Sequence, residues 1–156
     1  MYKRQRPETS NVPDVLGSFS NQLDAPPAVG RKLKEAVQSL GGDLCDFASV
    51  GHVWDERNER EIDATNFFFA SVLNWKPTWD QQSAGIEKII RRDGSAFYGI
   101  NPPYILDQKQ IPSCDLWRDS QTLNVICSEN FKTTLDRAGA AGMYFRKLQL
   151  SSRKEK

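Results

Sequence analysis

The sequence has few of the residues that a metal site requires. Its 156 residues include three cysteines and one histidine, and no two cysteines form a CxxC pair. A structural zinc ion is held by four ligands, usually Cys and His at short spacings. We therefore expect no zinc site, and a chain of this length can bury a core without disulfides or metals.

Long apolar runs are also missing. The best candidate for a membrane span, Phe67–Leu73, is far shorter than the about 20 residues that a transmembrane helix needs. The basic start of the chain leads into polar residues rather than an apolar segment, so no secretory signal is evident. These features predict a cytoplasmic protein that does not associate with membranes.

The charges are nearly balanced. There are 21 Lys and Arg residues against 20 Asp and Glu residues, for a formal charge of +1. Proteins that capture nucleic acid electrostatically carry a basic stripe, and the pair Arg91-Arg92 is too small to form one. We therefore expect no nucleic-acid partner. The chain also has no Gly-rich phosphate loop and no GxSxG motif, so no motif calls for an enzyme.

Two segments share a helix–glycine–strand pattern. In 31–50 the apolar side chains recur at helical spacing, Gly41-Gly42 follows, and Leu44–Val50 has the character of a strand. In 128–148, Ser128 is a candidate N-cap, Gly139 a candidate helix end, and Gly142–Leu148 a candidate strand. The two units are similar, although any short amphipathic helix followed by a strand gives such a likeness.

The middle of the chain is rich in strand signals. Ala64–Leu73 is β-branched and aromatic, which predicts a central strand buried on both faces. Asp93-Gly94 is a strong turn signal between the candidate hairpin strands Ile86–Arg92 and Ala96–Ile100. Further short strands are expected at Asp115–Arg118 and Leu123–Cys127. We predict one α+β domain over 1–156, with a mixed or antiparallel sheet, a few short helices, an ordered core at about 12–150, and charged tails.

The single histidine has two interpretations. His52 could activate one of the thiols, Cys45, Cys114 or Cys127, for nucleophilic catalysis. The simpler interpretation is that Cys45 and Cys127 fill strands as small apolar residues, because cysteine is among the most buried residue types. Cys114 follows Pro112 in a loop, so we expect it to be the most exposed thiol.

The balanced total charge conceals a locally acidic stretch at residues 54–63. It holds five acids and two arginines, a net charge of −3. Such a stretch next to a tryptophan suits a basic partner surface, although it is also typical of a solvated connection. Trp75 and Trp79 flank Pro77, and tryptophan is common both at binding hot spots and in cores. The candidate partner-binding residues are Trp54, Asp55, Glu56, Glu59, Glu61, Trp75 and Trp79.

Three motifs carry a resemblance to a known family. They are Asn74-Trp-Lys-Pro-Thr-Trp-Asp80 with Ser83, Cys114-Asp-Leu-Trp-Arg118, and a closing helix that leads into Gly139, Gly142 and Phe145. Over about residues 30 to 150, the chain resembles the eleventh-numbered family of bacterial immunity proteins. The resemblance implies a non-catalytic cytoplasmic antidote, encoded beside a polymorphic toxin that is delivered by contact-dependent or type VI-like secretion. Such a protein binds and occludes its cognate toxin domain and needs no cofactor.

Within this resemblance, Asp80 and Ser83 match the family pattern. We expect a structural role for them, because an Asp after a turn can accept hydrogen bonds from nearby backbone amides. Two other classes stay open. A Cys/His enzyme requires one thiol beside His52, and a small-ligand-binding regulatory domain requires a deep apolar pocket with few polar groups.

Overall fold

The computed structural model describes residues 15–16, 26–56 and 58–151. These residues form an α+β fold, as predicted, with two α-helices and several small sheets. The tails expected at the two ends lie outside the described residues, apart from Ser151. None of the described helices has the length and apolar character that a membrane crossing demands.

The elements follow one another along the chain. The strands are β1 (Val15–Leu16), β2 (Ala28–Gly30), β3 (Cys45–Ser49), β4 (Val53–Asp55), β5 (Arg60–Ile62), β6 (Phe67–Val72), β7 (Trp75–Lys76), β8 (Gly85–Ile90), β9 (Ala96–Asn101), β10 (Ile105–Leu106), β11 (Leu116–Asp119), β12 (Val125–Cys127) and β13 (Gln149–Leu150). The helices are α1 (Arg31–Ser39) and α2 (Glu129–Ala138), and short 3-10 turns cover Ala64–Asn66 and Gln108–Gln110.

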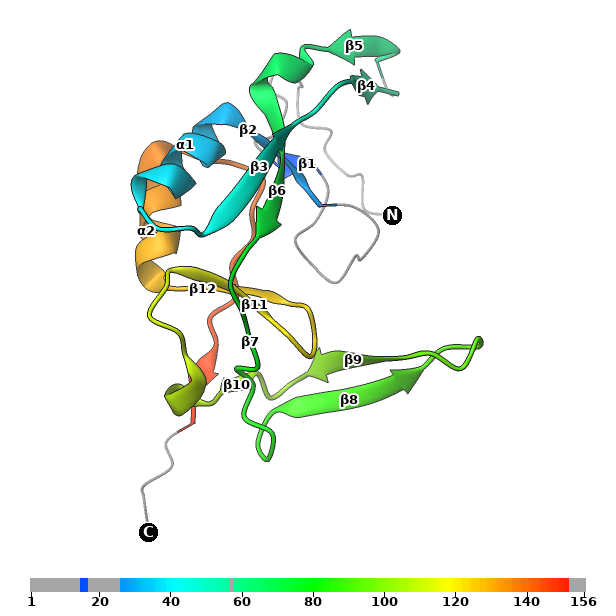
Figure 1. Ribbon diagram of the computed structural model, residues 1–156, viewed down its shortest axis with the longest axis vertical. Helices are drawn as coiled ribbons and strands as arrows, with labels where there is room; N and C mark the ends of the chain where they lie inside the picture. The colour runs from blue at the N-terminus through cyan, green and yellow to red at the C-terminus, as the bar shows by residue number, and fades with distance from the viewer. Residues whose placement is uncertain (1–14, 17–25, 57, 152–156) are drawn as a thin grey trace, which may run out of the picture.

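The largest sheet has the order β1-β2-β6-β3, and its strands are antiparallel. The predicted central strand is therefore confirmed, although it begins at Phe67 because residues 64–66 form a 3-10 turn. The expectation of burial on both faces holds only at the start of the strand, where Phe67 is buried in a separate small cluster. Ala70 and Val72 are buried, whereas Phe69 is 37% exposed. Both helices pack on one side of this sheet, so only that side of the sheet contacts the main core (Figure 1).

Both helices form where the sequence predicts them. Leu33 and Val37 of α1 meet Phe131 and Leu135 of α2 in this core, because each pair lies four residues apart on one helix face. Ser128 caps α2 by accepting a hydrogen bond from the Phe131 backbone amide.

The strand expected at Gly142–Leu148 is not formed. This segment is irregular until β13, which pairs in parallel with β10. Met143 and Phe145 are partly buried against the main core, whereas Tyr144 between them is 88% exposed. The segment thus shows the alternating side-chain exposure of a strand, but among the described residues it has no neighbouring strand to pair with. The two similar units thus share a helix and a glycine, but only the first continues into a strand.

A second, smaller core lies beside β7, β11 and β12. Its buried members are Trp79, Leu106, Trp117 and Ile126. The strand β11 joins its antiparallel neighbour β12 to the parallel strand β7.

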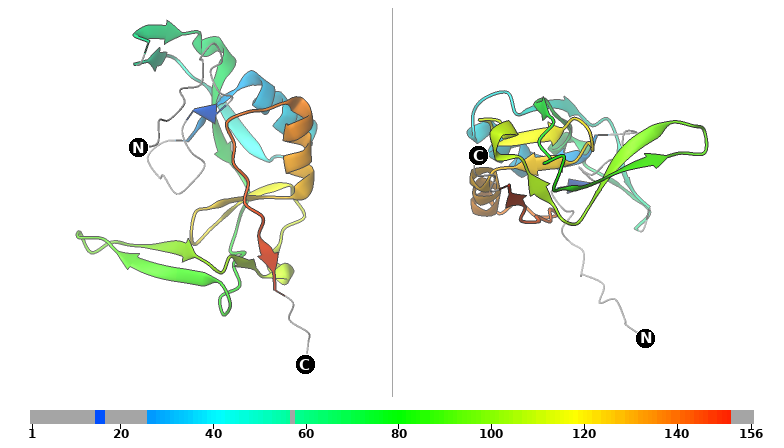
Figure 2. Two further views of the ribbon diagram at one scale, coloured as in Figure 1. Left: turned by 180° about the vertical axis from the view of Figure 1, so that it is seen from behind. Right: turned by 90° about the horizontal axis from the view of Figure 1, so that it is seen from below.

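Two hairpins extend from the molecule. One pairs β8 with β9, as predicted, and the other pairs β4 with β5. They leave opposite ends of the long axis, on the side away from the helices (Figures 1 and 2).

Candidate functional site: an acidic hairpin

The acidic stretch of the sequence forms the β4–β5 hairpin. Val53 lies opposite Ile62, Trp54 opposite Glu61, and Asp55 opposite Arg60. Because side chains alternate along a strand, Val53 and Ile62 share one face, and both pack against a small cluster at the base of the hairpin. That contact anchors the hairpin and leaves the other face free for solvent.

The outward face carries an aromatic pair and a carboxylate. The rings of His52 and Trp54 are stacked, with centroids 6.4 Å apart and planes 12° from parallel. His52 Nδ1 lies 3.0 Å from Glu61 Oε1. Trp54 is 52% exposed even though it has these neighbours. We call His52, Trp54 and Glu61 the outward platform.

The tip of the hairpin is organised by Asp55. Its carboxylate accepts hydrogen bonds from the Asn58 backbone amide at 3.2 Å and from the Asn58 side chain at 2.7 Å. Arg60 Nε lies 3.5 Å from the same carboxylate. Asp55 was predicted as a partner contact, but it is half-buried and holds the turn. Glu56 and Glu59 are exposed near the tip.

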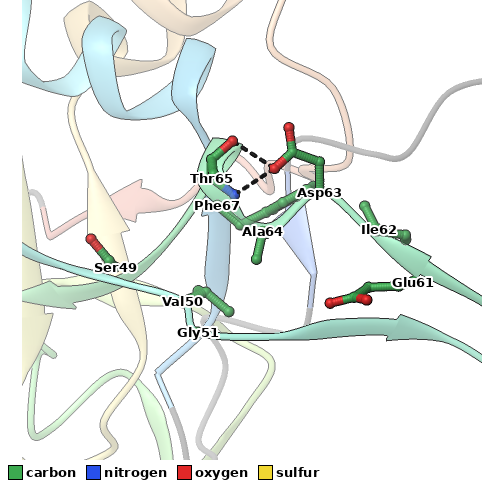
Figure 3. Close-up of a pocket in the computed structure, with 9 residues that line it drawn as sticks. All are labelled: Ser49, Val50, Gly51, Glu61, Ile62, Asp63, Ala64, Thr65 and Phe67. Atoms are coloured by element: carbon green, nitrogen blue, oxygen red, sulfur yellow. Dashed lines mark hydrogen bonds between the residues drawn. The ribbon is translucent and has the colours of Figure 1, made fainter.

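A pocket of about 690 Å³ lies at the base of the hairpin. It is lined by Ser49, Val50, Gly51, Glu61, Ile62, Asp63, Ala64, Thr65 and Phe67. Figure 3 shows the side chains of Glu61 and Ala64 in the space between the two segments that form the pocket. The lining combines carboxylates and hydroxyls with apolar groups, so it differs from the deep apolar pocket that a small-ligand-binding domain requires.

One carboxylate at this pocket is held by its own turn. Asp63 Oδ1 accepts hydrogen bonds from the Thr65 hydroxyl at 2.6 Å and from the Thr65 backbone amide at 3.0 Å (Figure 3). These bonds favour the ionised form, so they lower the pKa of Asp63, and Arg31 adds a smaller electrostatic contribution. Asp63 is therefore an anion that caps the short 3-10 turn before β6.

The two tryptophans around Pro77 differ in burial. Trp75 is 50% exposed on β7, and the Arg118 guanidinium lies 5.5 Å from the centre of its ring. Trp79 is only 4% exposed, and its indole N–H donates to the Thr122 hydroxyl at 2.7 Å. The prediction that Trp79 forms part of a binding surface is corrected, because its side chain fills the second core. Since β7 lies well away from β4 and β5, Trp75 is not part of the outward platform (Figure 1).

The Asp-x-x-Ser segment has the structural role that was expected. Asp80 is buried, and its Oδ1 accepts hydrogen bonds from the backbone amides of Gln82 and Ser83, each at 3.0 Å. This segment therefore shapes the turn before β8.

The thiols lie apart from the histidine. Cys45 begins β3 opposite Val72, whereas His52 follows the other end of β3 and contacts the acidic hairpin. Burial raises the pKa of Cys45 to about 12 and the pKa of Cys127 to about 11. A nucleophilic thiol needs the opposite shift. All three thiols, Cys114 included, are half-buried.

The platform contains one residue whose role was not expected from the sequence. His52 was considered only as a catalytic base, although it precedes Trp54 by two positions. Residues two apart on a strand share a face, so this spacing was the available signal for the stacked pair. Over the described ranges 15–16, 26–56 and 58–151, no three His, Cys, Asp or Glu side chains gather in a way that could hold a metal ion.

The fold and this hairpin define a small α+β protein whose most distinctive surface is acidic and aromatic. The sequence model of the immunity protein family Imm11 matches residues 6–149. The chain therefore belongs to the Imm11 immunity protein family, which confirms the resemblance that the three motifs indicated. The search of curated proteins found no match.

Proposed function

We propose that this protein binds one cognate toxin domain in the cytoplasm and neutralises it by occlusion, without catalysis. Membership of an immunity protein family supports a role in toxin immunity. The observation that carries the finer proposal is the outward platform of the β4–β5 hairpin. In this proposal the whole chain acts as one domain, and the toxin arrives by contact-dependent or type VI-like secretion.

The platform has the properties of a binding hot spot. Trp54 offers a large aromatic surface, and its stacking on His52 restricts it before any partner arrives. Tryptophan is enriched at hot spots because it buries much area and loses little conformational entropy. An anchor that is already ordered reduces the entropic cost of binding.

The charges around the platform indicate a basic partner surface. Glu56, Glu59 and Glu61 are all exposed along the hairpin. Complementary charges steer association and suppress wrong partners. We therefore propose that the toxin presents Lys or Arg side chains to this hairpin, with Trp75 as a separate, second contact.

The experiment that tests the proposal is co-expression with the toxin encoded beside this gene, together with a binding titration of the purified pair. We expect Trp54→Ala to weaken binding by about 2 kcal/mol or more, which is roughly 30-fold. The double variant Glu56→Lys/Glu59→Lys is expected to slow association and to reduce protection, because it reverses the charge at the tip.

Matched controls separate this effect from general damage. Tyr144→Ala removes an aromatic side chain that is 88% exposed elsewhere on the surface, and Glu35→Lys reverses an exposed charge on α1. Both are expected to protect fully. If Trp54→Ala and the tip variant protect as well as the wild type, the platform is not the binding surface.

His52 distinguishes occlusion from catalysis. If the protein were a Cys/His enzyme, His52→Ala would abolish its action at every concentration. In the occlusion proposal this variant loosens Trp54 and weakens binding, and an excess of the variant restores full protection. Loss of protection that excess protein does not restore would contradict the proposal.

A further inference from the structure

The β8–β9 hairpin has two long edges. Each strand has six residues, and among the described residues the two strands pair only with each other. Ile90 is 69% exposed and Ile89 is 36% exposed. A long edge strand with apolar side chains is a template for pairing with another strand.

The turn shows which backbone groups of β8 face outward. Gly94 (φ +83°) donates its amide to the Arg91 carbonyl at 3.0 Å, and the Arg91 amide donates to the Ser95 carbonyl at 2.8 Å. This is a three-residue hairpin loop with a bulge. Hydrogen-bonded pairs alternate along an antiparallel ladder, so Ile89 pairs through hydrogen bonds with Phe97, whereas Lys88 and Ile90 direct their backbone groups outward.

The edge of β8 is complementary to itself. When a second β8 is laid antiparallel with Ile89 opposite Ile89, the outward groups of Lys88 and Ile90 face those of the other copy. The same register places Glu87 of each copy opposite Arg91 of the other copy. It also places Lys88 of each copy opposite Ile90 of the other copy. No like charges lie directly opposite each other, and opposite-charge cross-strand pairs stabilise a sheet.

The side chains of this register form two covered surfaces. On one face, Ile89 and Phe97 of each copy meet at the centre, and the Arg91 guanidinium already lies 4.9 Å from the centre of the Phe97 ring. On the other face, the aliphatic stem of Lys88 covers Ile90 of the second copy. Pairing would therefore remove the most exposed apolar side chains of this hairpin from water.

The shape of the molecule leaves room for this contact. In Figure 1 the free edge of β8 faces away from the rest of the chain, while β9 lies on the side of the main body. A twofold axis between the two paired Ile89 residues places the rest of each chain at opposite corners of the joined hairpins. The charge also separates this surface from the acidic platform, because the hairpin carries three basic and two acidic residues.

We propose that β8 is a homodimer interface, in which two copies form a continuous sheet of order β9-β8-β8-β9 centred on Ile89. The occupant of the edge is a second copy of this chain. Five residues of each strand, 87 to 91, take part. Such a short interface gives a weak dimer, with a dissociation constant of about 10–100 μM.

Sedimentation velocity of the full chain over about 1–500 μM tests the proposal. We expect the wild type to shift from monomer to dimer across this range. Arg91→Glu puts a carboxylate opposite Glu87 of the other copy at both ends of the paired segment. It is therefore expected to weaken the dimer by about tenfold or more. The double exchange Glu87→Arg/Arg91→Glu restores the opposite charges, and we expect it to restore the dimer.

Two further variants complete the test. Arg92→Glu makes the same charge change just outside the paired segment and is expected to leave the dimer intact. Ile89→Lys places two ammonium groups at the twofold axis and is expected to abolish the dimer, with far-UV circular dichroism as the check on folding. A chain that stays monomeric at 500 μM, or a dimer that Arg91→Glu and Ile89→Lys do not weaken, would overturn the proposal. Dimerisation is measured by sedimentation and toxin neutralisation by protection. Failure of the dimer proposal can therefore be told apart from failure of the proposed toxin-binding role of the acidic platform.

Discussion

The Asp119 carboxylate accepts a hydrogen bond from the backbone amide of Thr78, with 2.8 Å between Oδ2 and the nitrogen. The two residues are 41 positions apart in the chain, and both are buried. The other oxygen, Oδ1, accepts from the Gln121 and Thr122 amides and from the Thr122 hydroxyl. One side chain thus joins the loop after β7 to the loop after β11.

Replacing this carboxylate is expected to be costly. Asp119→Asn substitutes a donor for one acceptor, so at least one buried N–H loses its partner, and we expect a loss of about 2–3 kcal/mol in the free energy of unfolding. Urea denaturation measures this loss. Glu35→Gln, an equivalent change at an exposed site, serves as the control and is expected to stay within about 0.5 kcal/mol of the wild type.

The two tryptophans around Pro77 provide a second comparison. Trp79→Phe removes the donor to Thr122 and part of a buried ring, so it is expected to destabilise the fold by about 1–3 kcal/mol. Trp75→Phe changes a half-exposed ring whose N–H bonds to the Val72 carbonyl, and water can replace that bond. We expect it to cost about 0.5 kcal/mol or less. Equal losses in thermal denaturation would contradict the assignment of Trp79 to the core.

Gly139 tests the end of α2. Its φ of +64° is left-handed, and a Cβ added there meets nothing within 4 Å. The cost of Gly139→Ala is therefore that of the backbone conformation alone, about 1 kcal/mol. A Cβ added at Gly51 likewise meets nothing within 4 Å, but Gly51 has no left-handed φ. Gly51→Ala is therefore the matched control and is expected to be nearly neutral in thermal denaturation.

The half-buried thiols Cys45 and Cys127 predict how stability depends on alkaline pH. Because burial raises the pKa of Cys45 to about 12 and that of Cys127 to about 11, both stay protonated in the folded chain above pH 9, where they ionise in the unfolded chain. The unfolded state then binds fewer protons, so stability falls as the pH rises from 9 towards 11. Each thiol contributes at most about 1.4 kcal/mol per pH unit.

Urea denaturation at pH 8, 9 and 10 measures this slope. The double variant Cys45→Ala/Cys127→Ala is expected to lose less stability between pH 9 and 10 than the wild type does. It is expected to be less stable at pH 8, because two half-buried side chains are shortened. An identical slope in the two proteins would show that the thiols do not titrate in this manner.

Much of the local structure was predictable because nearby residues determine it. Ser128 and Gly139 mark the ends of α2 through contacts within a few positions, and Asp93-Gly94 specifies its hairpin turn through the backbone freedom of glycine. The sequence of Gly142–Leu148, which was predicted to form a strand, was misleading. It correctly indicated an extended segment, but it carried no information about whether a neighbouring strand is present to form a ladder.

For the candidate site, the sequence indicated the acidic stretch and Trp54 as its aromatic member. It did not show that Asp55 turns inward to Asn58, or that His52 joins the platform. Those outcomes depend on the register of β4 against β5, which is fixed by the packing of Val53 and Ile62 on the base of the hairpin.

The scarcity of cysteine and histidine and the balanced charge were properties of the sequence alone, and they already disfavoured a zinc site and broad capture of nucleic acid. Helix ends, turns and the α+β class also followed from the sequence, because they arise from interactions between residues close together in the chain. Only the tertiary structure decided that Trp79 is buried while Trp75 is half-exposed, and that Thr78 meets Asp119. Burial and long-range hydrogen bonds depend on which distant segments pack together, and a local sequence pattern does not contain that information.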